Sequence, residues 1–133
     1  ARPTTVTTLE AIFAPLGFLF PLHEEQMPLL TAVSGSGPGY LFYLAEILFD
    51  ILVHRGFDAS TAARVVAFLF DGAGATLAGG ESPKTLKERV CSPGGTTIAG
   101  LAVMERRGIA SIIEEAVESA AQRARELSHI AEE

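Results

Sequence analysis

The strongest constraint in this sequence is an apolar segment, Tyr40 to Val53, whose only charged side chains are Glu46 and Asp50. In a helix, residues four apart lie on one face, so the two carboxylates share a face and the other faces are apolar. A helix that is hydrophobic nearly all round must be covered nearly all round. A chain of 133 residues holds one core of ordinary size, so we expect a second subunit to provide part of the cover.

The bulk composition excludes several classes of function. Apolar residues make up 48% of the chain and charged residues 20%, which agrees with surface that is buried in an oligomer. The net charge of -6 comes without a basic run, so no nucleic-acid partner is expected. The apolar segment falls short of the roughly 20 residues that cross a bilayer, so no membrane partner is expected either.

The reactive side chains outside the glycine-rich loops offer little chemistry. Cys91 is the single cysteine, and no Cys or His residues have metal-ligand spacing, so we expect no disulfide and no metal site. Cys91 has no histidine near it in sequence and is expected to be a small hydrophobic residue. His54 and His129 should lie at helix ends in structural roles, and Lys87 and Arg89 should be solvated. The N-terminal residues show no secretion signal, so we expect a reducing, cytoplasmic location.

The hydrophobic periodicity and the turn residues predict an all-α chain with at most one brief extended piece. Thr8, Ser36 or Gly37, and Asp58 or Ser60 are the expected helix caps. A flexible hinge is expected at Ser34–Gly39, and the small residues Gly72–Ala75 would permit a close helix crossing. The expected helices are Leu9–Leu16, Glu24–Leu30, Pro38–His54, Ala59–Leu77, Lys84–Val90, Thr96–Arg107 and a long amphipathic helix from Ile109 to Ile130, with the extended piece at Phe18–Phe20.

The loop Ser92-Pro93-Gly94-Gly95-Thr96-Thr97 is the main candidate site. Two glycines that lead into a helix let the backbone approach a ligand, and the first N–H groups of the helix have no internal acceptors. Such a site suits a carboxylate or a phosphate, and the two threonine hydroxyls add hydrogen-bonding groups. The residues alone leave a second interpretation open, in which the segment is a plain loop with a threonine cap.

Three segments resemble successive signatures of the pyrroline-5-carboxylate reductases, and they occur in the family's order. They are Thr31-Ala-Val-Ser-Gly-Ser-Gly-Pro-Gly-Tyr40, Leu86-Lys-Glu-Arg-Val-Cys-Ser-Pro-Gly-Gly-Thr-Thr-Ile-Ala-Gly-Leu101 and Arg123-Ala-Arg-Glu-Leu127. The resemblance implies an all-α dimerisation domain of the 6-phosphogluconate dehydrogenase C-terminal-like type. It assigns residues 1–30 to a remnant of the dinucleotide-binding domain with its linker, and residues 31–133 to the helical dimerisation and substrate-binding domain.

The same resemblance implies a function in proline biosynthesis. Its members reduce 1-pyrroline-5-carboxylate to L-proline with NAD(P)H, as homodimers or larger assemblies. Carried onto this chain, the carboxylate site consists of Ser92, Gly94, Gly95 and Thr96, and the hydroxyl of Thr97 is the catalytic group that bonds the ring nitrogen. The chain has no Gly-x-Gly-x-x-Gly fingerprint, so no cofactor is expected to bind these residues and the isolated chain should be inactive.

The chain departs from the family pattern at three places. Gly39 stands where alanine is usual, Phe68 and Leu69 stand where a Gln-Thr pair is expected, and Pro28–Leu30 lacks a usual acidic residue. These departures leave two other functions open. One is an assembly module without substrate binding, and the other is a domain of a related imine or keto-acid reductase.

Overall fold

The computed structural model describes residues 3–17 and 19–131, and all regular secondary structure in these residues is helical. The all-α prediction is therefore confirmed. The α-helices are α1 (Pro3–Phe13), α2 (Met27–Leu30), α3 (Gly37–His54), α4 (Ala59–Ala78), α5 (Pro83–Arg89), α6 (Thr96–Arg106) and α7 (Ile109–Ala131). Two short 3-10 helices, η1 (Ala14–Leu16) and η2 (Glu24–Gln26), and a π-helix, η3 (Thr31–Gly35), complete the set.

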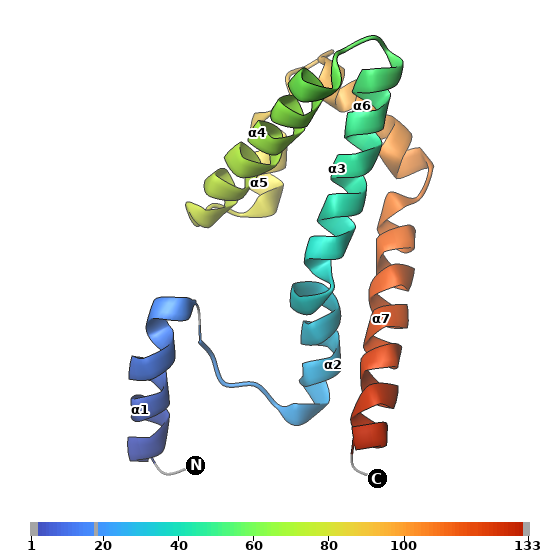
Figure 1. Cartoon of the computed structure of the whole chain (residues 1–133). Helices are drawn as coiled ribbons and strands as arrows, with labels where there is room; N and C mark the ends of the chain where they lie inside the picture. The colour runs from blue at the N-terminus through green and yellow to red at the C-terminus, as the bar shows by residue number, and fades with distance from the viewer. Residues whose placement is uncertain (1–2, 18, 132–133) are drawn as a thin grey trace.

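The helices form an open arrangement around one long rod. The segments α2, η3 and α3 follow one another in a single line, and α7 runs beside α2 and η3 in the opposite direction (Figure 1). Helix α4 packs against α3 and then diverges from it (Figure 1), and residues of α4 and α5 line a common groove. Helix α1 stands apart from the other helices (Figure 1). The chain therefore leaves long helix faces without cover from its own residues.

The predicted hinge at Ser34–Gly39 is wrong, because the helix continues through it. The backbone N–H of Ser36 donates to the carbonyl oxygen of Thr31 at 3.0 Å, which is the wider hydrogen-bond spacing of a π-helix. The hydroxyl of Ser34 donates to the Leu30 carbonyl at 2.8 Å. Ser36 stands at the predicted N-cap position of α3, but it has helical dihedral angles and its side chain forms no capping hydrogen bond. Packing of η3 against α7, with Ala32 fully buried, outweighs the weak helix preference of these small residues.

The predicted cap of α4 at Asp58 is confirmed, and the neighbouring helix boundaries also have local causes. Gly56 has a φ of 94°, a left-handed conformation that glycine adopts without steric cost. The carboxylate of Asp58 accepts a hydrogen bond from the Thr61 backbone N–H at 2.9 Å and caps α4. Ser82 caps α5 in the same way, by accepting from the Thr85 N–H at 3.1 Å. Each boundary thus follows from a local side-chain hydrogen bond or a glycine.

The start of the chain differs from the prediction. Helix α1 begins at Pro3, well before the expected start at Leu9, so Thr8 lies inside the helix and does not cap it. Proline suits a first helical position, because it has no N–H group that the helix must satisfy. Phe18 of the expected extended piece lies outside the described residues, and the two residues after it have no regular secondary structure.

Very few side chains are buried in the described part of the chain. The buried hydrophobic residues are Ala32, Ala62, Val66 and Ala121. By contrast, Phe42, Phe68 and Tyr43 are 72%, 67% and 65% exposed. Burying a large apolar side chain contributes roughly 1.5–3 kcal/mol, so an arrangement that leaves so many in water needs a further covering surface. Helix α3 contains no buried residue, so the described part of the chain does not cover it, and its cover by a second subunit stays a prediction.

The small residues of α4 form no close helix crossing within the chain. A Cβ atom added to Gly72 or Gly74 would meet nothing within 4 Å. The predicted close approach is therefore not made by any helix among the described residues. This face of α4 remains accessible to another molecule.

The argument from length against a membrane span is wrong for the helix that contains the apolar segment. The continuous helix Glu24–His54 has 31 residues, and Glu24–His54 and Ala59–Ala78 are both long and apolar enough to cross a bilayer. Length and composition alone do not separate a membrane helix from a helix that is covered in a soluble assembly. The apolar surface of these two helices is also what a subunit interface requires.

Candidate functional site

The glycine loop forms a tight turn between α5 and α6. The backbone N–H of Gly95 donates to the Ser92 carbonyl oxygen at 2.9 Å. Gly94 has a φ of 71°, so a left-handed residue is required there. Gly95 has ordinary extended angles, but a Cβ atom on it would overlap the Ser92 hydroxyl oxygen and lie 2.9 Å from the Ser92 carbonyl oxygen. The two glycines are thus required for different reasons.

Helix α6 begins directly after this turn with its first N–H groups available. Gly95 is the N-cap residue, and no side chain caps the helix. The predicted threonine cap is therefore wrong, whereas the interpretation of the segment as a plain loop stays open. The first regular hydrogen bond runs from the Ala99 N–H to the Gly95 carbonyl oxygen at 3.3 Å. The preceding N–H groups, those of Thr96, Thr97 and Ile98, have no helical acceptors, and the helix dipole gives this end a partial positive charge.

The structure places all the predicted site residues at this turn or in the first turn of α6. Ser92, Gly94 and Thr96 are exposed, whereas Gly95 and Thr97 are half-buried. The backbone N–H groups at this helix start can donate hydrogen bonds to a carboxylate or phosphate, and the hydroxyl groups can donate or accept. It contains no ionisable side chain of its own, so its chemistry is binding and orientation.

The candidate residues outside the glycine loop are two histidines, one cysteine and one arginine. The ring Nδ1 of His54 lies 2.7 Å from the Asp50 carbonyl oxygen, within hydrogen-bonding distance and on the same helix. Cys91 is a half-buried free cysteine, and the described residues contain no cluster that could hold a metal ion. Arg89 forms an ion pair with Glu81, so the prediction that it is only solvated is wrong. Nothing is described of the side chain of His129.

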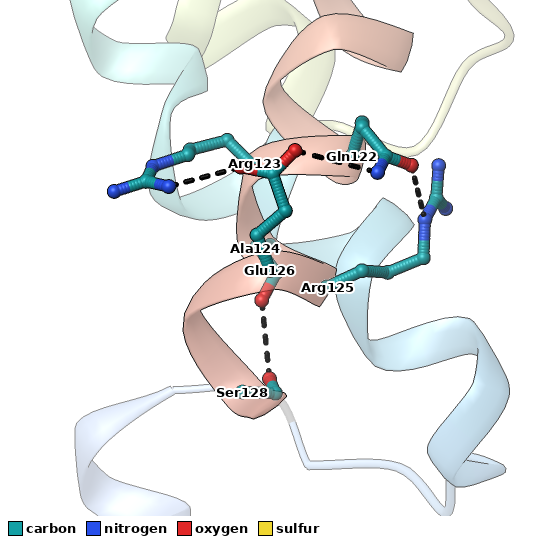
Figure 2. A network of polar contacts seen from close by, with 6 residues as sticks. All are labelled: Gln122, Arg123, Ala124, Arg125, Glu126 and Ser128. Carbon is teal, nitrogen blue, oxygen red and sulfur yellow. Dashed lines mark hydrogen bonds and ion pairs between the residues drawn. The ribbon is translucent and has the colours of Figure 1, made fainter. Parts of the chain in front are cut away.

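The third family-like segment lies on α7, away from the glycine loop, and forms a polar network there (Figure 2). Arg123 donates to Glu126 at 2.9 Å, and Gln122 donates to the other oxygen of Glu126 at 3.4 Å. Arg125 donates to Gln122 at 3.1 Å and to Glu118 at 2.6 Å. The hydrogen bonds from Arg123 and Gln122 lower the pKa of the Glu126 carboxyl below its ordinary value. The polar side chains of this segment therefore bond to one another and to Glu118 along α7.

The environment of the Tyr40 hydroxyl in α3 could not be predicted from the sequence. The hydroxyl oxygen of Tyr40 is shielded from solvent and forms no hydrogen bond within the described residues. A buried polar group without a partner is uncommon in folded proteins. Tyr40 lies in the first turn of α3, shortly after η3.

Known reductases match most of the chain. A pyrroline-5-carboxylate reductase from Synechocystis is 38% identical over 127 residues, which is 95% of this chain and 48% of that protein. The reductase from Thermus thermophilus is 38% identical over 117 residues, 88% of this chain and 44% of that protein. The chain thus spans less than half the length of these relatives.

Solved structures agree in fold. A pyrroline-5-carboxylate reductase from Coxiella burnetii matches with a TM-score of 0.87 and 29% identity, over 96% of this chain and 48% of that one. The reductase from Plasmodium falciparum, solved with NADP bound, matches with a TM-score of 0.79 and 28% identity, over 92% of this chain and 50% of that one.

The family described as pyrroline-5-carboxylate reductase dimerisation matches residues 24–127. The match includes η2 and α2 upstream of the first resembling segment, the glycine loop, and α7 through Leu127. The chain belongs to the pyrroline-5-carboxylate reductase dimerisation family.

Proposed function

We propose that this chain is the dimerisation and substrate-carboxylate-binding part of an enzyme that reduces 1-pyrroline-5-carboxylate to L-proline with NAD(P)H. Family membership and the names of the relatives support the reaction. The single observation that carries the substrate site is the turn from Ser92 to Gly95, which leads into an uncapped helix. The proposal places the protein in the cytoplasm.

The substrate carboxylate is proposed to bind at the start of α6. The available N–H groups and the positive end of the helix favour an anion. Gly94 and Gly95 carry no side chains that would hold a ligand away from the backbone. The hydroxyls of Ser92 and Thr96 are both exposed and can add hydrogen bonds to the two carboxylate oxygens.

Thr97 is proposed as the catalytic residue. Its hydroxyl would bond the ring nitrogen, fix the orientation of the cyclic imine and assist the transfer of a proton to that nitrogen. Orientation and hydrogen bonding of this kind lower a barrier without a strong acid or base. This role agrees with a loop that contains no ionisable side chain.

No contact to the nicotinamide cofactor is proposed for these residues. A dinucleotide site of the usual kind needs a strand, a glycine-rich turn and a helix, and the regular structure of the described residues is helical. We propose no step of hydride transfer through this chain. The proposed division remains a cofactor-domain remnant with linker at residues 1–30 and the helical domain at residues 31–133.

The proposed assembly is a homodimer or a larger homo-oligomer. The family description names dimerisation, and α3 and α4 leave large apolar side chains exposed. Covering these side chains with a second copy would remove them from water on both subunits. The oligomer is thus proposed to complete the core that the single chain lacks.

A titration tests the proposed substrate site. The ligands are L-proline and pyrrolidine, which share the ring but differ in the carboxylate. Calorimetry should detect binding of proline, with pyrrolidine bound much more weakly, because the proposed site holds the carboxylate. Binding of neither ligand would favour the alternative of an assembly module, which the exposed Phe68 and Leu69 support. Equal binding of both ligands would contradict a site that holds the carboxylate. A related imine or keto-acid reductase would instead bind a different carboxylated ring or chain in the same titration.

A further inference from the structure

Helix α5 leads directly into the glycine loop, and it has little packing of its own. It spans seven residues, Pro83–Arg89, and isolated helices of this length are marginal in water. No other described element makes extensive contact with it, and a groove of about 640 Å³ lies between it and α4. Local interactions at the two ends of α5 must therefore decide how well this helix is ordered.

The start of α5 has a side-chain cap, and its end has no equivalent. Ser82 accepts a hydrogen bond from the Thr85 N–H at 3.1 Å, and Pro83 suits the first helical position. At the other end the C-cap residue, Val90, has helical dihedral angles. The first residue after the helix with a positive φ is Gly94, so no left-handed residue closes the last turn.

One ion pair joins the two ends of α5. Arg89, the last helical residue, donates from Nη2 to the Oε2 atom of Glu81, which stands two residues before the helix. The helix between them is about 10 Å long, and a helical side chain leans toward the N-terminus, as this contact requires. A second ion pair on α5 joins Lys84 and Glu88 at 4.0 Å, but it spans only one turn.

The end of α5 and the candidate site share one short stretch of chain. Only two residues separate Arg89 from Ser92, and the N–H of Cys91 donates to the Glu88 carbonyl oxygen at 3.1 Å. The Ser92 carbonyl oxygen in turn accepts the hydrogen bond from the Gly95 N–H at 2.9 Å. Fraying of the last turn of α5 would therefore carry Ser92 away from the start of α6.

We propose that the ion pair of Glu81 and Arg89 positions the substrate-carboxylate site. It holds the last turn of α5, and through that turn it holds Ser92 in the place that the start of α6 requires. Both side chains are positioning residues, because they act through Ser92 and need not touch the substrate. The inference rests on the proposed function and adds two residues outside the loop to the proposed site.

A freed guanidinium group would act on the site with the opposite sign. Arg89 carries the charge that attracts a carboxylate, and removal of Glu81 would release it to move toward the loop. In that arrangement Glu81 would weaken substrate binding by holding Arg89 back. The side chains of Arg89 and Glu81 are 57% and 45% exposed, so solvent screens their longer-range attraction. We therefore expect the order of the helix end to have the larger effect.

Substitutions distinguish these two effects by their sign. Glu81→Gln and Arg89→Gln should each raise the dissociation constant for L-proline about twofold to fivefold, the range that exposed ion pairs produce. The exchanged pair Glu81→Arg/Arg89→Glu should bind proline more tightly than either single variant. The matched control is Lys84→Gln, which removes the single-turn ion pair of the same helix and should leave the dissociation constant unchanged.

Two further measurements locate the effect. Amide hydrogen exchange at Val90 and Cys91 should become faster in Glu81→Gln and Arg89→Gln, because the end of α5 opens more often. In the complete reductase, the same two variants should raise KM for the cyclic imine by a similar factor and leave kcat nearly unchanged. This pattern is expected when binding is weakened equally in the ground state and the transition state.

The outcomes separate this inference from the proposed function. The parent chain is titrated first, and a parent that does not bind proline would overturn both. With a parent that binds, unchanged affinity in Glu81→Gln and Arg89→Gln would overturn the positioning role alone. Tighter binding by Glu81→Gln would also overturn it, because Glu81 would then be holding the guanidinium away from the ligand. A loss in Lys84→Gln equal to that in the other variants would show that the ion pair across α5 has no special role.

Discussion

The hydroxyl oxygen of Ser92 occupies the place where a side chain at residue 95 would begin. The same two residues are joined by the hydrogen bond from the Gly95 N–H to the Ser92 carbonyl oxygen. Ser92 thereby controls which residue can stand at the N-cap of α6. The shape of the candidate anion site depends on this pair.

Gly95→Ala should damage the site without unfolding the chain. The added methyl group must displace Ser92 or rotate the start of α6, so proline binding should weaken by about tenfold or more, the range of a lost charged hydrogen bond. Calorimetry measures the affinity, and circular dichroism verifies the helix content. Gly100→Ala is the control, because a Cβ there meets nothing within 4 Å. It should keep proline affinity and stabilise α6 by roughly 0.5–1 kcal/mol; equal loss of binding in both variants would contradict the steric account.

Gly94→Ala should act through backbone strain. Its φ of 71° is a left-handed conformation that costs an alanine roughly 1–2 kcal/mol. We expect a lower midpoint in urea unfolding at fixed protein concentration. Gly94→Asn should lose less, because asparagine tolerates this conformation better. The same loss in both variants would show that φ at residue 94 is not the cause.

The Asp58 cap of α4 should make the free energy of unfolding depend on pH. The hydrogen bonds from Thr61 lower the pKa of the Asp58 carboxyl in the folded chain. A carboxyl with a lowered folded pKa stabilises fully above its unfolded pKa, and this stabilisation is lost as the pH falls through the folded pKa. Urea midpoints should therefore show the parent chain more stable than Asp58→Asn at neutral pH, with the difference shrinking in strong acid. A difference that stays constant down to the acid limit would contradict the role of the charge.

Thr97→Val tests the proposed catalytic hydroxyl in the complete reductase. Valine keeps the shape of threonine and removes the hydrogen bond, so the turnover rate should fall while the melting temperature changes little. A loss of 10-fold to 100-fold corresponds to about 1.4–2.7 kcal/mol of barrier. Thr97→Ser keeps the hydroxyl and should recover most of the rate. Turnover of Thr97→Val at the parent rate would remove Thr97 from the mechanism.

The helices with a clear period and a local stop signal could be predicted from sequence. Helix α4 follows from its Asp58 cap, and α3 ends before Gly56 as expected. The π-helix could not be predicted in the same way. Its residues Ser34 and Gly35 have a turn-forming composition, whereas the packing of η3 against α7 joins residues far apart in the sequence.

The candidate site was located by sequence, but its geometry was not. The spacing of Gly94 and Gly95 indicates a close backbone approach. It does not reveal that Gly95 is needed because of Ser92, or that Gly95 and not a threonine is the N-cap. These facts depend on the fold of the turn. The early start of α1 at Pro3 was missed for a related reason, because a threonine-rich segment has a weak helix preference.

The most direct test of the central claim is an amide titration of the labelled chain with L-proline, followed by NMR. If the loop binds the carboxylate, the resonances of Gly95, Thr96 and Thr97 should shift in a saturable manner, and those of Ala121, which is buried on α7, should not. The Gly95→Ala chain should need at least about tenfold more proline for the same shifts. Resonances of the loop that stay in place at every proline concentration, or that shift equally in Gly95→Ala, would contradict the account.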